Sequence, residues 1–357
     1  MWMQQYKTIR ILQKILGVCA IILTAFLILV MLIGALDYLE LWSDTSVFSG
    51  ASFLSPSWLL LPALLLALIL YLVQKKTLSS ILVIVYTVYF LLMGDISFAS
   101  LFSNEKAASN DKQLSVLTLN VRYYSYGMDN IFNFLDSLDA DVVLLSENTL
   151  PADSIQLLSN LDDKYTVFTG KKYETAVLSK FPVVFAKEVE FPTYQASLSG
   201  SNEIDSLDKN PHRSFSHLRV IVEDKEIDVI SVRFIAGRPK THKLKDQLEW
   251  GRYLIEQQKK EVDFFVDYVE ALDRPVIFGG DLNVPPNAKV MKPLYDIAKD
   301  VAREEKFIPS PTFRTEFPVM RLDYLFTMNG IKTLTYSKLD AVVSDHFPVY
   351  AKFAFNY

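Results

Sequence analysis

The chain has 357 residues, half of them hydrophobic, and its formal net charge at pH 7 is −5. This acidic balance argues against a protein that binds nucleic acid through a generally basic surface, because such binding needs Lys and Arg residues that neutralise phosphates. The only cysteine, Cys19, excludes an internal disulfide framework, so the folded part must be held together by its hydrophobic core.

Three apolar runs come first in the chain, at about residues 11–38, 55–74 and 77–94. The first contains ILGVCAIILTAFLILVMLIGAL, which has no charged residue and can cross a hydrocarbon core about 30 Å thick. A cleaved signal peptide would explain only one such run, and buried helices of a soluble protein are the alternative for the second and third. The sequence therefore predicts a membrane domain over residues 1–95 with three transmembrane helices.

The charges around these runs predict the orientation of the chain. Lys7, Arg10 and Lys14 precede the uncharged stretch of the first run, Lys75 and Lys76 separate the second run from the third, and the loop DYLELWSDTS has no Lys or Arg. Positive charges favour the cytoplasmic side, so the amino terminus is expected in the cytoplasm and the residues after the third run outside it. The predicted location is the plasma (inner) membrane, as a multi-pass protein with an extracytoplasmic or periplasmic carboxyl-terminal domain.

A small, polar linker over residues 96–112 precedes a domain that is expected to span residues 113–357. Its strand-like segments include SVLTLNV, DVVLLSE, EIDVISVRF, PVIFGGD and FPVYAKFAF, and MDNIFNFLDSLD has apolar residues at helical spacing. A long helix is predicted from about residue 241 to 272, and a short one at about 294–302. Residues 195–214 are polar and Ser-rich, which is typical of a loop. Strands and helices that alternate in this way predict an α/β sandwich.

Polar residues stand at the ends or beginnings of several predicted strands. They are Asn120, Glu147, Asp281, Asn283, Asp323, Asp345 and His346. Each of them could belong to an ordinary turn, because Asp, Asn and Gly are common turn formers. Carboxylates are rarely buried unless they are paired or bound to a cation, and ligands of open α/β sheets bind at the carboxyl ends of strands. The set therefore favours a single polar site that contains one imidazole.

The domain resembles the endonuclease/exonuclease/phosphatase superfamily in the order of its segments, which are LTLNVR, LLSENT, AVLSKFPV, GGDLN, PTF, RLDYLF and SDHFPV. That superfamily includes apurinic endonucleases, deoxyribonucleases, inositol polyphosphate 5-phosphatases and neutral sphingomyelinases. The resemblance covers residues 113–357. It implies a four-layer α/β sandwich, in which two mixed β-sheets are flanked by helices and the active site lies at one edge.

The resemblance also implies a metal site. Glu147 resembles the metal-binding glutamate of the superfamily, Asn120 is expected beside it, and Asp345 resembles the aspartate at the edge of the metal site. Mg²⁺ prefers oxygen ligands and needs only one or two carboxylates, whereas zinc favours His and Cys. Mg²⁺ (or Mn²⁺) is therefore the expected cofactor.

Four further residues are expected to carry the chemistry. By the same resemblance, Asp281 orients or deprotonates the attacking water, Asn283 holds the scissile phosphate, and His346 contacts that phosphate. Asp323 matches the carboxylate that orients this histidine. A carboxylate beside His346 would raise the pKa of the imidazole, so that it meets the anionic phosphate as a cation.

Arg233 is the main departure from the superfamily pattern. A His or Tyr that donates a proton or a hydrogen bond to phosphate is common there, whereas Arg stabilises phosphate charge but cannot release a proton near neutral pH. Arg213 resembles a position near the substrate in some relatives, so both arginines are candidate substrate-binding residues. Ser146 stands where a Gln is usual. Three other histidines are candidates for the missing proton donor, although each is more typical of a surface loop or helix: His212, His217 and His242.

These residues lead to one hypothesis and two alternatives. The first is a membrane-anchored, divalent-metal-dependent phosphoesterase that hydrolyses a phosphodiester or phosphomonoester outside the cytoplasm. A lipid headgroup is the favoured substrate, because a membrane anchor raises the effective concentration of lipids at the site. An extracytoplasmic nuclease is the second, and it would need a basic stripe beside the site. The third is a catalytically degenerate domain that binds a phosphorylated ligand or a protein partner, and Arg233 motivates it.

Overall fold

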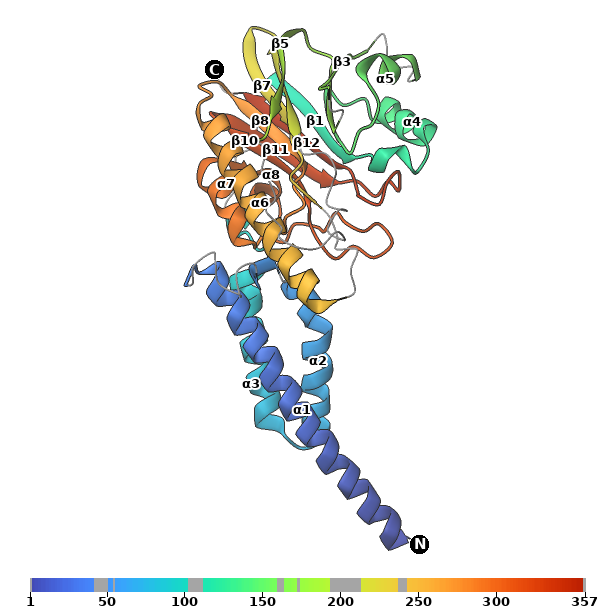
Figure 1. The fold of residues 1–357 in the computed structure, drawn as a ribbon, viewed down its shortest axis with the longest axis vertical. Coiled ribbons are helices and arrows are strands. Elements are labelled where there is room, and N and C mark those ends of the chain that lie inside the picture. The colour runs from blue at the N-terminus through green and yellow to red at the C-terminus, as the bar shows by residue number, and fades with distance from the viewer. Residues whose placement is uncertain are drawn as a thin grey trace. The chain divides into compact units, whose positions relative to one another are not determined.

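The computed structural model describes residues 2–41, 51–53, 55–101, 112–158, 164–171, 174–192, 213–236 and 243–355, shown as a ribbon in Figure 1. The chain divides into two compact units. One comprises Met1–Asp95 with Asn287–Lys289, and the other comprises Ile96–Pro286 with Val290–Tyr357. Each unit has its own hydrophobic core.

The first unit is helical. Its elements are α1 (Trp2–Tyr38), the short 3₁₀ helix η1 (Ala51–Phe53), α2 (Pro56–Leu72) and α3 (Lys76–Met93). Ser55 caps α2 by accepting a hydrogen bond from the Ser57 amide, and a proline at the first helical position suits a helix start. The helices pack along a buried stripe that includes Leu70, Leu82 and Met93. Their outward faces leave many large apolar side chains exposed to the surroundings.

Two helices in the described part of this unit are long and apolar enough to cross a membrane, Arg10–Tyr38 and Lys76–Met93. The third, α2, is apolar but shorter, with 17 residues. The three transmembrane helices expected at 11–38, 55–74 and 77–94 therefore stay a prediction, as does the orientation of the chain.

The second unit contains two mixed β-sheets in its described part. Sheet A consists of β1 (Lys112–Asn120), β2 (Val142–Ser146), β3 (Thr166–Thr169), β4 (Thr175–Ser179), β11 (Ile331–Lys338) and β12 (Val349–Phe355), in the order β11-β12-β1-β2-β4-β3. Sheet B consists of β5 (Val183–Glu190), β6 (Ser214–Val222), β7 (Lys225–Ser231), β8 (Val276–Asp281), β9 (Lys299–Asp300) and β10 (Asp323–Met328), in the order β5-β6-β7-β8-β10-β9. Each sheet has one parallel pair at its centre, β1 with β2 and β7 with β8, and its other pairs are antiparallel.

The two sheets face one another across the main core, in which Val116, Val142, Val229 and Ile277 are fully buried. Helices α4 (Met128–Leu138) and α5 (Ala152–Leu158) pack against sheet A. On the other side, α6 (Leu244–Glu270) covers sheet B through aromatic contacts such as Phe265 with Phe278, and α7 (Lys292–Ile297) lies beside it (Figure 1). The remaining short helices are α8 (Val301–Glu305), η2 (Ala99–Leu101), η3 (Arg122–Tyr124) and η4 (Lys289–Met291). These layers confirm the predicted α/β sandwich.

Some predicted elements differ from the structure. The short helix expected at about 294–302 is instead two helices, α7 and α8, separated by strand β9. The break has a local cause, because the Asp300 carboxylate accepts a hydrogen bond from the Ala302 amide and so caps a new helix. The long helix α6 is continuous from Leu244 to Glu270. Within the segment predicted as a loop, residues 195–212 lie outside the described residues.

A candidate active site where the two sheets meet

The carboxyl ends of the two parallel pairs deliver polar residues to the same edge of the sandwich. Asn120 is the last residue of β1, and Glu147 directly follows β2, its parallel neighbour. In sheet B, Asp281 ends β8 and pairs directly with Asp323, the first residue of the antiparallel strand β10. His346 lies shortly before β12, which runs antiparallel to β1. The strand ends therefore bring these residues together from both sheets.

Two glycines allow β8 to deliver Asp281 to this edge. A Cβ atom on Gly279 would lie 2.3 Å from the carbonyl oxygen of Tyr324, and one on Gly280 would lie 1.9 Å from that of Val232. Gly280 also has a φ of +145°, which residues with a side chain rarely adopt. The backbone of β8 thus passes too close to its neighbours for any other residue type.

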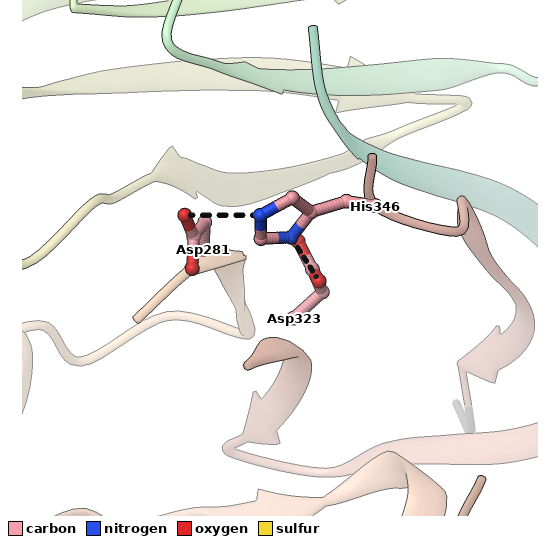
Figure 2. A group of neighbouring side chains, drawn as sticks. All are labelled: Asp281, Asp323 and His346. Atoms are coloured by element: carbon pink, nitrogen blue, oxygen red, sulfur yellow. Dashed lines mark hydrogen bonds and ion pairs between the residues drawn. The ribbon is translucent and has the colours of Figure 1, made fainter. Parts of the chain in front are cut away.

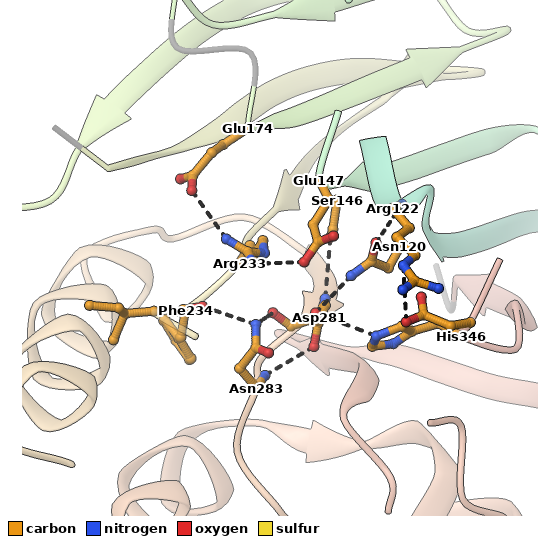
Figure 3. Close-up of polar contacts among 12 residues, drawn as sticks. Asn120, Arg122, Ser146, Glu147, Glu174, Arg233, Phe234, Asp281, Asn283 and His346 are labelled. Atoms are coloured by element: carbon orange, nitrogen blue, oxygen red, sulfur yellow. Dashed lines mark hydrogen bonds and ion pairs between the residues drawn. The ribbon is translucent and has the colours of Figure 1, made fainter. Parts of the chain in front are cut away.

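Asp281 lies at the centre of the site, with a side chain that is almost fully buried. Asn120 Nδ2 donates a hydrogen bond to Asp281 Oδ2 at 2.8 Å, and the backbone N–H of Asn283 donates to Asp281 Oδ1 at 3.1 Å (Figure 3). Burial raises the pKa of Asp281, and the Asp323 carboxylate raises it further, while the His346 cation opposes the rise. The result is a carboxylate with more affinity for a proton than an exposed one.

His346 stands between two buried carboxylates (Figure 2). Its Nδ1–H donates to Asp323 Oδ2 at 2.8 Å, which fixes the orientation of the ring, and its Nε2 lies 4.0 Å from Asp281 Oδ2. Burial alone lowers the pKa of this imidazole, but the carboxylates of Asp323 and Asp281 outweigh burial and raise the pKa to about 10. His346 is therefore a cation at neutral pH.

Glu147 and Asn283 have left-handed backbone conformations, with φ of 54° and 53°. Such conformations are uncommon for residues other than glycine, although Asn adopts them more readily than Glu, and they are often found at functional sites. Asn283 Nδ2 donates to the carbonyl oxygen of Phe234 at 3.1 Å, which points the amide along the edge of the site (Figure 3). The second amide hydrogen makes only a marginal contact, at 3.5 Å, with the carbonyl oxygen of Asp281.

Arg233 ties Glu147 to a residue that the sequence did not single out, Glu174. Its Nη2 donates to Glu147 Oε1 at 2.8 Å and its Nη1 donates to Glu174 Oε1 at 3.2 Å (Figure 3). Burial lowers the pKa of this guanidinium, but the carboxylates of Glu147 and Glu174 outweigh that effect and raise it above its ordinary value. Arg233 is thus a permanent buried cation beside the expected metal-binding glutamate.

Arg213, the other arginine expected at the substrate, is directed at protein groups. Its Nε donates to Glu261 Oε1 at 2.7 Å, its Nη1 to Glu174 Oε1 at 2.9 Å, and its Nη2 to the carbonyl oxygen of Arg233 at 2.9 Å. This placement favours a role in holding Arg233 and Glu174.

Asp345 lies at the solvent side of the site. Its carboxylate forms an ion pair with Arg122, with 3.4 Å between Oδ2 and Nε. Arg122 follows β1 and is about half exposed at its side chain, and its amide donates to Asn120 Oδ1 at 2.8 Å. Both ends of the Asn120 side-chain amide are therefore engaged within the protein, one with Arg122 and one with Asp281.

The donor set of this edge fits a divalent cation. Asp281, Asp323 and His346 form a cluster whose ligand-type atoms all lie within 4.8 Å of one another. Mg²⁺ and Mn²⁺ prefer oxygen ligands, so the carboxylates and side-chain amide oxygens of this edge are better candidates than the imidazole. With all carboxylates ionised, the acidic groups exceed the cationic groups by two: Glu147, Glu174, Glu261, Asp281, Asp323 and Asp345 stand against Arg122, Arg213, Arg233 and His346.

Three residues of this network were missed as site residues in the sequence. Ser146 Oγ accepts a hydrogen bond from the Asp281 amide at 3.2 Å, and Arg122 contacts Asp345. Both are sequence neighbours of predicted site residues, which was the available signal. Glu174 directly precedes β4, a strand that is buried along its whole length, and a charged residue in that position could have been noted.

His217 is not a surface residue, contrary to the sequence-based expectation. It lies in strand β6 with only 1% of its surface exposed, 3.0 Å from Asp228 Oδ1 and 2.7 Å from the Tyr268 hydroxyl. The expectation failed because strand β6 is buried along nearly its whole length and its polar residues are paired with polar groups on neighbouring elements. His212 and His242 lie outside the described residues.

A family model described as the endonuclease/exonuclease/phosphatase family matches residues 117–346. The chain is also similar to solved structures. D. rerio TDP2 complexed with single strand DNA product is 18% identical with a TM-score of 0.52, and the match covers 68% of this chain and 99% of that one. An endonuclease/exonuclease/phosphatase family protein from Bacteroides thetaiotaomicron is 16% identical with a TM-score of 0.52, and the match covers 70% and 100%. A functionally unknown protein from Enterococcus faecalis V583 is 13% identical with a TM-score of 0.51, over 68% and 100%. No curated protein sequence matches the chain.

Proposed function

Since the chain belongs to the endonuclease/exonuclease/phosphatase family, we propose that it is a divalent-metal-dependent phosphoesterase that hydrolyses a phosphodiester or phosphomonoester. One observation carries this proposal. A cationic imidazole, His346, is held by Asp323 and faces a second buried carboxylate, Asp281, across a gap of 4.0 Å. A cation and a potential base that lie side by side at one edge of the sandwich suit an anionic phosphate and its attacking water, which would bind beside this pair.

Asp281 is the group that orients and deprotonates the water. Its hydrogen bonds from Asn120 and the Asn283 amide fix both carboxylate oxygens in place. Because burial raises its pKa, it accepts a proton more readily than an exposed aspartate does. The proton of the attacking water therefore moves to Asp281 as the new bond to phosphorus forms and the bond from phosphorus to the leaving oxygen breaks. The leaving group departs as an anion and takes its proton from solvent water.

The negative charge that builds up on the phosphate oxygens is stabilised from the other side. The His346 imidazolium donates from Nε2, because its Nδ1–H is already used on Asp323. Asn283 holds the same phosphate with the amide hydrogen that makes only the marginal contact. Arg233 adds a fixed positive charge but donates no proton to the leaving oxygen.

Glu147, Asp345 and the side-chain oxygen of Asn120 would hold the cation at this edge, next to the cluster of Asp281, Asp323 and His346. A bound Mg²⁺ or Mn²⁺ supplies charge stabilisation for the phosphate oxygens and polarises the ester. The excess of carboxylates over cationic groups at this edge supports the fit.

The substrate class that we favour is a lipid headgroup. Helices α1 and α3 are apolar over membrane-spanning lengths, and outward residues such as Ile22, Phe26 and Leu61 are more than 60% exposed. An apolar surface of this kind is typical of contact with lipid. A multi-pass anchor in the plasma (inner) membrane, with the catalytic domain outside the cytoplasm, would keep the site at high effective concentration next to headgroups.

A nuclease is the second candidate. It is favoured by the exposed guanidinium of Arg122 beside Asp345, and by the likeness to D. rerio TDP2, whose solved structure contains a single strand DNA product. Basic side chains next to a phosphoesterase site are the usual means of holding a nucleic-acid backbone.

The test compares substrates with one protein. The full-length chain is purified in detergent and supplied with Mg²⁺, sphingomyelin or phosphatidylcholine in mixed micelles, and single- or double-stranded DNA. We expect headgroup release, and a loss of about a thousandfold in rate for Asp281→Asn, because a positioned general base contributes on that order. The control is Asp263→Asn, which removes an exposed carboxylate of α6 and should leave the rate unchanged. Cleavage of DNA alone would favour the nuclease, and no cleavage of any substrate with retained Mn²⁺ binding would favour a ligand-binding domain.

A further inference from the structure

Five charged side chains of alternating sign run inward from Glu147. Arg233 bridges Glu147 and Glu174 at 2.8 and 3.2 Å, and Arg213 bridges Glu174 and Glu261 at 2.9 and 2.7 Å. Their side chains are between 2% and 15% exposed, so water screens the row only weakly. The charge of each member therefore acts strongly on its neighbours.

Arg233 is fixed within this row from both ends. Its carbonyl oxygen accepts from Arg213, and its two terminal nitrogens are shared between Glu147 and Glu174. The Arg233 Nε atom and the Glu174 Oε2 atom are buried without a hydrogen-bond partner among the described residues. Moving the guanidinium away from both carboxylates would leave the buried charge of Arg233 uncompensated, which is strongly unfavourable, whereas Glu174 would keep Arg213 as a partner.

A guanidinium at hydrogen-bond distance from a ligand carboxylate has a direct consequence for metal binding. It neutralises part of the charge that attracts the metal, and it repels a second cation on the same carboxylate. Glu174 has the opposite effect, because its negative charge compensates Arg233 and is itself close enough to attract a cation. One arginine between two glutamates leaves a net negative charge of one for the incoming ion.

We propose that Arg233 and Glu174 form an internal counter-ion pair that sets the affinity of Glu147 for its divalent cation. In this pair Arg233 lowers the affinity and Glu174 restores it, so Glu174 is a positioning residue for the site. The inference rests on the proposed function, since it takes Glu147 as a metal ligand. It predicts that the two residues change metal affinity in opposite directions.

A double-mutant cycle tests this with Mn²⁺ as the probe. Binding of Mn²⁺ to the full-length chain in detergent is measured by calorimetry for wild type, Arg233→Gln, Glu174→Gln and the double variant. We expect affinity to rise at least about tenfold in Arg233→Gln and to fall at least about tenfold in Glu174→Gln, because one unit charge is removed near the ion in a weakly screened site. The double variant should return to within about threefold of wild type, since the two charge changes cancel.

Matched variants separate charge from shape. Arg233→Lys keeps the positive charge, so its Mn²⁺ affinity should stay within about threefold of wild type. Arg219→Gln removes a guanidinium at the opposite end of sheet B, where Arg219 pairs with Asp228 near the start of β8, and should leave the affinity unchanged. Glu147→Gln should abolish binding. Thermal unfolding of each variant checks the fold, and if Arg233→Gln does not fold, Glu174→Gln still tests the charge effect, because unchanged affinity in that variant overturns the inference.

The outcomes separate two failures. If wild type binds no Mn²⁺, or Glu147→Gln binds it as well as wild type, the proposed metal site is wrong and the inference falls with it. If binding depends on Glu147 but Arg233→Gln leaves the affinity unchanged or lowers it, Arg233 does not act as a counter-ion, and only the inference is overturned. Unchanged affinity in Glu174→Gln has the same meaning for Glu174.

Discussion

The domain contains two buried His–Asp pairs in different surroundings. One is His346 with Asp323, at the edge where the sheets meet, and the other is His217 with Asp228, on strands β6 and β7 of sheet B. The histidines are 5% and 1% exposed, and the pairs have similar distances of 2.8 and 3.0 Å. By residue type, burial and distance the two are nearly equivalent.

They differ in what surrounds the second ring nitrogen and the carboxylate. Nδ1 of His217 contacts the Tyr268 hydroxyl at 2.7 Å, and Asp228 is shared with Arg219 at 2.8 Å. Nε2 of His346 instead faces a second carboxylate, that of Asp281, beyond hydrogen-bond distance. A His–Asp pair is therefore no sign of catalysis by itself. What matters is a ring nitrogen that the protein leaves available for another molecule.

Replacing each histidine in turn should give the largest difference in activity between the two pairs. His346→Gln should lower kcat/KM for the hydrolysed substrate by about 10² to 10⁴, because it removes the cation that meets the phosphate. His217→Gln should change kcat/KM by less than about threefold, because in our proposal that ring touches no substrate. A large loss in both variants, with both folded, would mean that the pairs are not functionally distinct.

Removing the carboxylate of the His217–Asp228 pair should affect stability instead of activity. Asp228→Asn leaves His217 and Arg219 without their shared partner, and breaking a buried pair typically lowers the free energy of unfolding by about 3–5 kcal/mol. Urea unfolding followed by circular dichroism measures this change. Activity is measured without urea, at a temperature well below the thermal unfolding transition of the variant. Unchanged stability would show that the Asp228 carboxylate contributes no net interaction.

The two pairs should also weaken at opposite ends of the pH range. The folded-state pKa of His346 is raised to about 10, above the ordinary value of about 6.5, so its contribution to stability is complete below pH 6.5 and is lost as pH rises toward 10. Burial raises the pKa of Asp228, but the hydrogen bonds from His217 and Arg219 outweigh burial and lower it, so its contribution is present above its ordinary pKa and is lost at more acidic pH. The melting temperature is measured across pH 3 to 10. The decrease that wild type shows at alkaline pH should be smaller in His346→Gln, and the decrease at acidic pH should be smaller in Asp228→Asn.

The smallest expected effect comes from Tyr268→Phe. This change removes the hydroxyl from His217 Nδ1 but keeps the ring contacts with Phe215, so it should lower the free energy of unfolding by about 1 kcal/mol. The rate of hydrolysis should not change. A gain or loss of activity in this variant would link the His217–Asp228 pair to the active site.

The sequence was informative where local pattern decides structure. Apolar runs that end in Asn120, Glu147 and Asp281 predicted strands with polar ends. The first two strands are parallel neighbours in sheet A, and the packing of the two sheets brings Asp281 to the same edge. Two strands at the outside of the sheets, β5 in sheet B and β11 in sheet A, were harder to predict. Strand β5 is mostly exposed and β11 mixes buried and exposed residues over a β-bulge, so neither shows a clear apolar period.

The network behind Glu147 could not be predicted from the sequence at all. Arg233 is 59 residues from Glu174 and 86 residues from Glu147, and only the packing of the two sheets brings the three together. His217 shows the opposite error, because a polar residue in an otherwise apolar strand was assigned to the surface although its partners are also buried. Pairing between distant polar groups leaves no periodic signal along the chain.

The path of the chain through the two sheets has a consequence for biosynthesis. Sheet B is built from one continuous stretch, residues 183–328, whereas sheet A combines strands from residues 112–179 with β11 and β12 near the end of the chain. His346 is therefore translated after every other residue of the proposed catalytic centre. A nascent polypeptide that does not yet include β11, His346 and β12 lacks both an imidazole at the centre and a complete sheet A. In our proposal, hydrolysis therefore begins only after these residues have been synthesised and folded.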